Sequence, residues 1–277
     1  MFSIGPWLAI SIALCDKYME GVSKLGICRW NVVMRQIFAT PVVWTLCFGM
    51  AVLGAMTLGT PVWSQDEARG DGFVALFDGA TLDGWIPHGG TARFWVEDAT
   101  IVGGSAPNTP NSFLCTRTEY DDFVLELEFK TDPRLNSGVQ IRSHVSDTPV
   151  EVSYEREDGT MYQMTILPGR VHGYQVEIDP SDRAYTGGIY DEGRRGWLYP
   201  LDGDDHRAAR EAFHQNQWNH LRVQAIGNSI QTWINGVPAA DFTDEWDSRG
   251  FIALQVHSVD NEEELQVRWR NLRIKSL

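Results

Sequence analysis

The chain has 277 residues, of which 43% are hydrophobic and 22% charged, and its 37 acidic and 23 basic side chains give a formal net charge of −14. This composition is typical of a folded globular protein and excludes a mainly disordered chain, a collagen and a multi-span membrane protein. The acidic balance argues against nucleic acid or an anionic membrane as partner. Eleven Trp and 26 Gly indicate β structure with an aromatic-lined surface.

Residues 1–64 are predicted to be a leader that precedes the folded domain. An uncharged apolar run covers residues 42–59, and Arg35 lies shortly before it, as in an export signal. Because Met34 followed by Arg35 reads as the start of a complete signal, we interpret residues 1–33 as an over-extended gene prediction and 34–64 as the signal peptide. Cleavage after Ser64 predicts a periplasmic or secreted protein, and the alternative is an uncleaved anchor with the remainder facing outward.

After a polar linker at residues 65–71, alternation of apolar and polar residues with period two dominates residues 72–277. It predicts strands at 93–103, 112–117, 123–130, 137–143, 172–179, 218–226, 229–242, 250–258 and 264–274. Asn235-Gly236 predicts a tight hairpin, and the sequence indicates one short helix, over 204–214, with Asp204 or Asp205 as its N-cap. Many short strands with almost no helix predict an all-β sandwich or jelly roll.

The segment 144–171 interrupts this alternation and is rich in acidic residues. We interpret it as an excursion between two strands over the rim of a sheet. Two readings stay open, a solvated loop and a lid that takes part in recognition.

Three of the predicted strands carry amide, carboxylate, guanidinium and imidazole groups opposite their apolar positions. These groups belong to Gln140, Arg142, Gln175, Glu177, Asp179, Gln255 and His257. Side chains two apart on a strand project from one face, about 6.5 to 7 Å apart. Paired donors and acceptors of this kind suit the vicinal hydroxyls of a sugar, whose C–H face stacks on an aromatic ring such as Trp85, Trp95, Tyr190 or Trp197. Taken singly, each polar residue also fits an exposed strand position, but together they predict a ligand-binding face.

The glycine-rich stretch 186–198 is the second informative segment. Its glycines permit tight turns, and Tyr190, Glu192 and Arg195 stand between them. The opposite charges either pair on the surface or form part of a site built on a loop.

An ordered set of motifs resembles the 3-keto-disaccharide hydrolase domain family. The motifs are FDGATLDGW (77–85), NSGVQIR (136–142), GYQVEID (173–179), TGGIYDE (186–192), RG (195–196), WN (218–219), WING (233–236) and GFIALQVH (250–257). They follow that family's order and cover about residues 72–277. The resemblance implies a concanavalin A-like jelly roll of two curved antiparallel sheets, with the ligand on the concave face. It also implies an exported bacterial enzyme that acts on glycosides already oxidised at C3.

A ketone at C3 acidifies the neighbouring C2–H, so a base can remove that proton and expel the C1 substituent, and water then adds to the enone. We expect Glu177 or His257 as base, Arg142 at the enolate, and Tyr190 or Glu192 as acid. The residues expected to bind substrate are Gln140, Gln175, Asp179, Arg195, Gln255 and Trp197. If Glu177, Asp179, Glu192 and His257 converge, they suit Ca²⁺ or Mn²⁺; the alternative is that these carboxylates pair with Arg142 or Arg195.

Two other functions stay open at this point. One is direct hydrolysis by two carboxylates, for which jelly-roll glucanases use positions that correspond here to Gln175, Glu177 and Asp179. The first of these is an amide, which cannot act as the nucleophile. The other is a non-catalytic carbohydrate-binding module, for which the fold is also used. The sequence leaves the aglycone, the linkage and the oligomeric state open.

Overall fold

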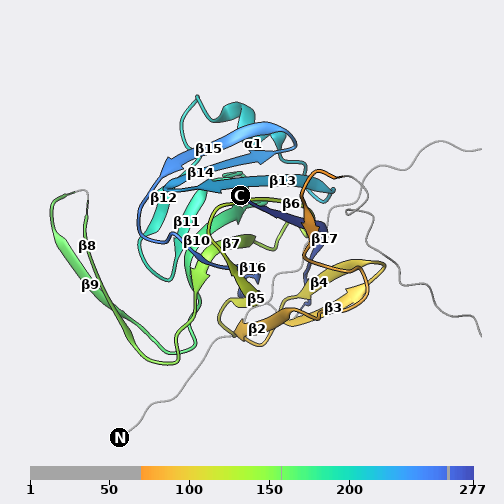
Figure 1. Ribbon diagram of the computed structural model, residues 1–277, viewed down its shortest axis with the longest axis horizontal. Helices are drawn as coiled ribbons and strands as arrows, with labels where there is room; N and C mark the ends of the chain where they lie inside the picture. Colours follow the sequence, from red (N-terminus) through yellow and green to blue (C-terminus); the bar gives the residue numbers. More distant parts are fainter. Residues whose placement is uncertain (1–69, 157, 261–262) are drawn as a thin grey trace, which may run out of the picture. The chain divides into compact units, whose positions relative to one another are not determined.

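The computed structural model describes residues 70–156, 158–260 and 263–277. Most of this part of the chain forms two antiparallel sheets that share one hydrophobic core (Figure 1). The architecture confirms the predicted all-β sandwich with one short helix. The predicted leader, residues 1–64, lies outside the described residues. Within the described residues, no helix is both long and apolar enough to span a bilayer.

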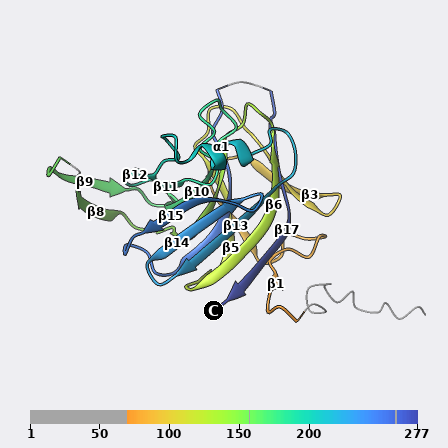
Figure 2. The same ribbon diagram turned by 90° about the horizontal axis from the view of Figure 1, so that it is seen from above.

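The larger sheet has eight strands in the order β15-β14-β13-β6-β17-β4-β3, with β1 paired to β17. The strands that Figure 2 labels in this sheet, from β15 across to β17, lie side by side as one layer. Its strands are β1 (Val74–Ala75), β3 (Arg93–Glu97), β4 (Thr100–Gly104), β6 (Phe123–Thr131), β13 (Asn219–Ile226), β14 (Ser229–Ile234), β15 (Val237–Thr243) and β17 (Gln266–Ser276).

The smaller sheet has seven strands in the order β12-β11-β10-β7-β16-β5-β2. Its strands are β2 (Trp85–Gly89), β5 (Ser112–Tyr120), β7 (Ser137–His144), β10 (His172–Ile178), β11 (Ile189–Glu192), β12 (Gly196–Tyr199) and β16 (Gly250–Val256). Nearly every residue of the three central strands is buried, on both faces. This sheet therefore buries polar side chains on the face that points away from the core.

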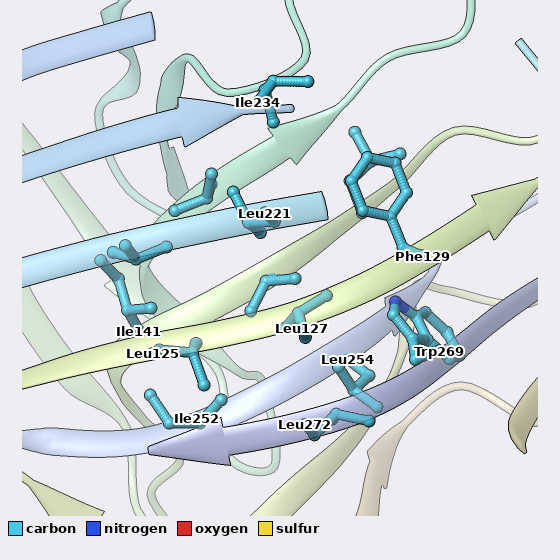
Figure 3. Close-up of a cluster of buried hydrophobic side chains, with 14 of the residues drawn as sticks. Leu125, Leu127, Phe129, Ile141, Leu221, Ile234, Ile252, Leu254, Trp269 and Leu272 are labelled. Carbon is cyan, nitrogen blue, oxygen red and sulfur yellow. The ribbon is translucent and has the colours of Figure 1, made fainter. Parts of the chain in front are cut away.

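Alternating apolar side chains from both sheets fill the space between them (Figure 3). In this core, β6 contributes Leu125, Leu127 and Phe129, β7 contributes Ile141, and β16 contributes Leu254. All five side chains are fully buried. Each such side chain contributes roughly 1.5 to 3 kcal/mol when fully buried. Because the apolar side chains face inward, the polar residues between them are directed to the opposite face.

Two hairpins show how turn chemistry sets strand boundaries. Asn235 and Gly236 have φ of 50° and 83° between β14 and β15, as the sequence predicts for a primed two-residue turn. The strand predicted over 93–103 is instead two strands, β3 and β4, joined at Asp98 and Ala99 with φ of 49° and 54°. An Ala in the left-handed region gives no turn signal, so the sequence pattern missed this hairpin.

The predicted helix is α1 (Arg207–Ala212), which is shorter than expected. Its N-cap is His206, with no side-chain capping bond, so the expected cap by Asp204 or Asp205 was wrong. Asp204 pairs instead with Arg207 at 2.6 Å.

The excursion between β7 and β10 contains a β-hairpin of its own. Its strands, β8 (Val150–Glu155) and β9 (Met161–Ile166), pair only with each other among the described strands, and the hairpin extends away from the two sheets (Figure 1). Tyr154 packs on Trp246, with ring centroids 6.0 Å apart. Residues 167–170 then return the chain to the smaller sheet, at the edge of the candidate site.

Candidate active site

A polar cavity of about 340 Å³ lies on the face of the smaller sheet that points away from the core. This volume is within the range of small-molecule sites, about 300 to 1,000 Å³. The cavity is lined by Asn111, Asn136, Arg170, Gln175, Glu177, Arg183, Tyr190, Glu192, Trp197, Gln255 and His257. Seven of these residues are among the candidates predicted from the sequence.

Strand register explains why these side chains meet. Gln175 of β10 is opposite Tyr190 of β11, which is opposite Trp197 of β12. In the neighbouring row, Gly138 of β7 lies between Glu177 and Gln255. A Cβ at Gly138 would come within 2.5 Å of the Gln175 side chain, so the glycine leaves the space into which the Gln175 amide folds.

A chain of amide hydrogen bonds crosses this space and orients Gln175. The Oε1 atom of Gln175 accepts hydrogen bonds from Nε2 of Gln140 and Nε2 of Gln255, each at 2.7 Å. Its Nε2 group donates to Oε2 of Glu177, also at 2.7 Å. Ser143 fixes the end of the chain by donating to Gln140 at 2.8 Å. Gln140 thus supports Gln175 from beneath and does not line the cavity, contrary to its expected contact with substrate.

Gln255 lines the cavity but is fully buried. Its Oε1 atom is inaccessible and has no hydrogen-bond partner among the described residues. A buried acceptor without a partner costs about 1 to 3 kcal/mol.

Glu177 is the central carboxyl group of the cavity. Its Oε1 accepts a hydrogen bond from Asn136 at 2.6 Å, and its Oε2 accepts the bond from Gln175. Burial raises the pKa of Glu177 to about 7, more than these two hydrogen bonds lower it. Such a carboxyl exchanges protons near neutral pH.

Tyr190 and Glu192, two apart on β11, face the same cavity. Burial raises the pKa values of the Tyr190 phenol and the Glu192 carboxyl, which favours the protonated form of both. Asn111 donates to Glu192 at 3.5 Å, and Arg170 lies 3.8 Å from the same carboxylate oxygen. Trp197 packs edge-on against Tyr190, with ring centroids 5.3 Å apart, so an aromatic wall borders this side of the cavity.

His257 follows the last residue of β16 and lies on the Glu192 side of the cavity. Its Nδ1 is 2.8 Å from the carbonyl oxygen of Ser258. A carbonyl only accepts, so Nδ1 carries the proton, and in the neutral ring Nε2 is the basic nitrogen.

The sequence predicts that the Arg142 guanidinium lies in the site. In the structure, the guanidinium of Arg183 lines the cavity instead. It reaches the cavity from the loop between β10 and β11, where its Nη2 lies 3.9 Å from Oε1 of Glu177 and its guanidinium is 5.0 Å from the Trp197 ring centroid. Asp179 holds it by a 2.7 Å bond to Nε. Asp179, which the sequence predicts to bind substrate, does not line the cavity; its carboxylate accepts hydrogen bonds from Arg183 and from backbone N–H groups of the same loop.

Arg142, which the sequence placed at the enolate, does not line the cavity. The register of β7 against β16 shifts at this point, and Arg142 adopts a φ of 46°, so the alternation that predicted its direction is broken. Its side chain is buried and donates to the carbonyls of Asp121 and Gly227 and to Asp122 at 2.9 Å. Arg142 therefore ties two turns together and does not line the cavity.

Arg195, which the sequence predicts to contact substrate, belongs to a buried ion-pair cluster and does not line the cavity. Asp191, fully buried, pairs with both Arg194 and Arg195. Arg195 also binds Asp244 at 2.7 Å, and its guanidinium stacks 3.9 Å from the Trp246 ring centroid. The cluster fastens β11 to the loop after β15.

Two of the aromatic residues considered for stacking lie elsewhere. Trp85 is buried and donates its indole N–H to the carbonyl of Leu76. Trp95 is on β3, in the other sheet.

The predicted metal ligands do not form a cluster. In the described part of the chain, no group of three or more His, Cys, Asp or Glu side chains is arranged to hold a metal ion. Asp179 is paired with Arg183, which separates it from Glu177, Glu192 and His257. A bound Ca²⁺ or Mn²⁺ stays a prediction of the sequence.

Sequence reasoning did not single out four residues that line the cavity. Asn136 continues the polar face of β7, two positions before Gly138, so extending the alternation by one step finds it. Asn111, Arg170 and Arg183 lie in segments outside the regular strands, and no periodic pattern indicates where such side chains point.

Comparisons with known proteins find relatives of low sequence identity and one matching family. The curated 3-keto-disaccharide hydrolase of Bacteroides thetaiotaomicron is 23% identical over 246 residues, which cover 75% of this chain and 79% of that protein. A solved structure of a candidate glycosyl hydrolase from Parabacteroides distasonis is 18% identical, with a TM-score of 0.48 over 78% of this chain and 98% of that one. A carbohydrate-binding module from Bacillus subtilis is 15% identical and has a TM-score of 0.44; the match covers 70% of this chain and 96% of that one. The family described as the 3-keto-alpha-glucoside-1,2-lyase-like domain matches residues 72–275, and this chain belongs to it.

Proposed function

We propose that this protein is a carbohydrate hydrolase that cleaves 3-keto-glycosides, by elimination across C1–C2 followed by hydration. One observation carries the proposal: the carboxyl group of Glu177 is buried in a polar cavity, and its pKa is raised to about 7. A general base that works near neutral pH needs such a pKa. The family description and the name of the Bacteroides relative support the substrate class. Because the sequence predicts an export signal, we propose that the reaction takes place in the periplasm or outside the cell.

In the first step, Glu177 removes the proton from C2 of the 3-keto sugar. The electron pair of the broken C–H bond forms the C2–C3 double bond of an enolate, and negative charge develops on O3. The Arg183 guanidinium, near Glu177, and the Tyr190 hydroxyl, which stays protonated, stabilise that charge. Donors placed where charge develops account for about 10²- to 10³-fold of rate each in comparable sites.

In the second step, the enolate electrons re-form the C3 ketone and make a C1–C2 double bond while the C1–O bond breaks. The leaving oxygen takes the bonding pair and a proton from Glu192, whose raised pKa lets it carry that proton. Water, oriented by Nε2 of His257, then adds to C1 and returns a proton to Glu192, while Glu177, whose proton has by then exchanged with solvent, protonates C2. The products are a free 3-keto sugar and the aglycone alcohol, which is net hydrolysis.

Direct hydrolysis by two carboxylates fits the cavity less well. The position of a glucanase-type nucleophile is Gln175, an amide whose oxygen and nitrogen are both engaged in hydrogen bonds. An amide cannot form the glycosyl ester that a retaining mechanism requires.

The test compares a 3-keto-glucoside with the same unoxidised glucoside, using the purified protein and following products by mass. We expect cleavage of the keto form alone, and in D₂O one deuterium at C2 of the product. Glu177→Gln should abolish turnover and retain substrate binding, whereas Glu119→Gln, which removes an exposed ion pair with Arg249, should behave as the unaltered protein. Equal cleavage of the unoxidised glucoside would show that elimination is the wrong mechanism.

A further inference from the structure

A second cavity, of about 520 Å³, adjoins the polar one. The two share Asn111, Arg170, Glu192 and His257 as lining residues, so one molecule can occupy both. The residues that line only the second cavity are Gly89, Pro110, Phe113, Leu167, Pro168, Gly169, Val171 and Ser258. Of these eight, Ser258 alone has a polar side chain. The second cavity is therefore apolar except along the border with the first.

The backbone of this cavity offers few free donors. The N–H of Ser258 is bound to Asn111 at 2.9 Å. The N–H of Gly169 is bound to the carbonyl of Ser146, and that of Arg170 to the carbonyl of Leu167. A sugar ring in this cavity would lose the hydration of its hydroxyls without gaining paired hydrogen bonds, which is costly.

The apolar wall is held in place before any ligand arrives. Residues 167–170 form a turn closed by the Arg170 to Leu167 bond, and His172 donates from Nδ1 to the carbonyl of Arg170 at 3.2 Å. Leu167 nevertheless exposes 65% of its surface, and Phe113 and Val171 pack together behind the wall. A fixed wall that leaves a large apolar side chain in water gains free energy when an apolar group covers it.

We propose that this second cavity binds the leaving group of the substrate, and that the preferred leaving group is an apolar aglycone of about the size of an aromatic ring, not a second sugar. The inference rests on the proposed function, because it assigns the sugar to the polar cavity. Glu192, which lines both cavities, then stands where the bond between sugar and aglycone lies. This is the position required of the group that protonates the leaving oxygen.

The test measures kcat/KM for three 3-keto-glucosides, with methyl, phenyl and glucosyl leaving groups. We expect the phenyl compound to be preferred over both others. Leu167→Ser should lower kcat/KM for the phenyl compound roughly three- to tenfold and leave the methyl compound unchanged. The control is Met161→Ser, an exposed apolar residue on β9 outside both cavities, which should change neither. Preference for the glucosyl compound, or an equal effect of Leu167→Ser on methyl and phenyl compounds, would overturn the inference.

A binding measurement separates this inference from the reaction. Calorimetry with unoxidised phenyl and methyl glucosides needs no turnover. We expect at least tenfold tighter binding of the phenyl glucoside, and loss of most of that difference in Leu167→Ser. If no keto substrate is cleaved while this difference is present, the proposed reaction is wrong and the apolar site stands. If the two glucosides bind equally, the apolar site is wrong whatever is cleaved.

Discussion

The side-chain amide of Gln175 lies where a Cβ of Gly138 would be, within 2.5 Å of that position. This close approach lets Gln175 accept from Gln255 on one side and donate to Glu177 on the other. The orientation of the central carboxyl thus depends on a residue that has no side chain.

Gly138→Ala should therefore inactivate the protein without unfolding it. The added methyl displaces the flexible end of Gln175, and a misplacement of about 1 Å at a catalytic group costs on the order of 100-fold in rate. The measurement is kcat on a 3-keto-glucoside beside the melting temperature. Gly236→Ala, in the turn after β14, serves as the control, since it should lower stability because of its φ of 83° and leave the turnover rate of the folded protein unchanged. Full activity in Gly138→Ala would contradict the importance of the amide chain.

The pH dependence of kcat/KM should report Glu177. As a base it acts only when ionised, and burial raises its pKa to about 7, so activity should rise with pH through about 7 and fall at higher pH, where Glu192 loses the proton that it gives to the leaving oxygen. Asn136→Ala removes a hydrogen bond that favours the ionised form. This change should move the acidic limb to higher pH by roughly one unit, since such a bond contributes about 1.5 to 3 kcal/mol and one unit corresponds to 1.36 kcal/mol. An acidic limb near the ordinary glutamate value, unmoved in Asn136→Ala, would assign the base to another group.

Arg183→Gln should lower kcat by about 10²-fold, because it removes the cation proposed to stabilise the enolate. Its partner Asp179 is only 3% exposed and loses its cation in this variant, so the melting temperature should also fall and kcat is compared for the folded protein. Asp179→Asn should lower kcat by a smaller factor, because Arg183 keeps its charge but loses its firmest anchor. Arg207→Gln breaks an exposed ion pair far from these residues in sequence and is the matched control. Unchanged kcat in Arg183→Gln would show that O3 is stabilised elsewhere.

Arg142→Met tests the correction to its role. The guanidinium satisfies two carbonyls and Asp122, and leaving such buried groups unpaired costs about 2 to 3 kcal/mol. Urea denaturation should show this loss, while the folded fraction turns over substrate as fast as the unaltered protein. A donor at the enolate contributes about 10²-fold to the rate. If turnover falls by that factor and stability is unchanged, Arg142 acts in the site after all.

The fold could be predicted because its signals are local. In β6, Leu125, Leu127 and Phe129 alternate with charged residues, and this pattern predicts a strand from a few neighbouring residues. The pair Asn235-Gly236 predicts a turn in the same local way. The turn at Asp98 and Ala99 could not be found in this way, because the left-handed conformation of Ala99 is imposed by the pairing of β3 with β4.

The site was predictable where strands are regular and unpredictable where they are not. Gln175, Glu177 and Gln255 point into the cavity, as period two requires. The same rule failed at Arg142, because the register of β7 against β16 shifts there and the left-handed backbone of Arg142 breaks the alternation. It also gave no information on Arg183, whose direction is set by Asp179.

The hairpin formed by β8 and β9 pairs with no other strand among the described residues. Adding or deleting residue pairs at its tip would not alter the register of either large sheet. Insertions there leave the pairing of the strands that carry the site unchanged, while residues 167–170 at its base line the second cavity and Arg170 lines both. The length of this arm can therefore vary while the strand that carries Glu177 stays in place.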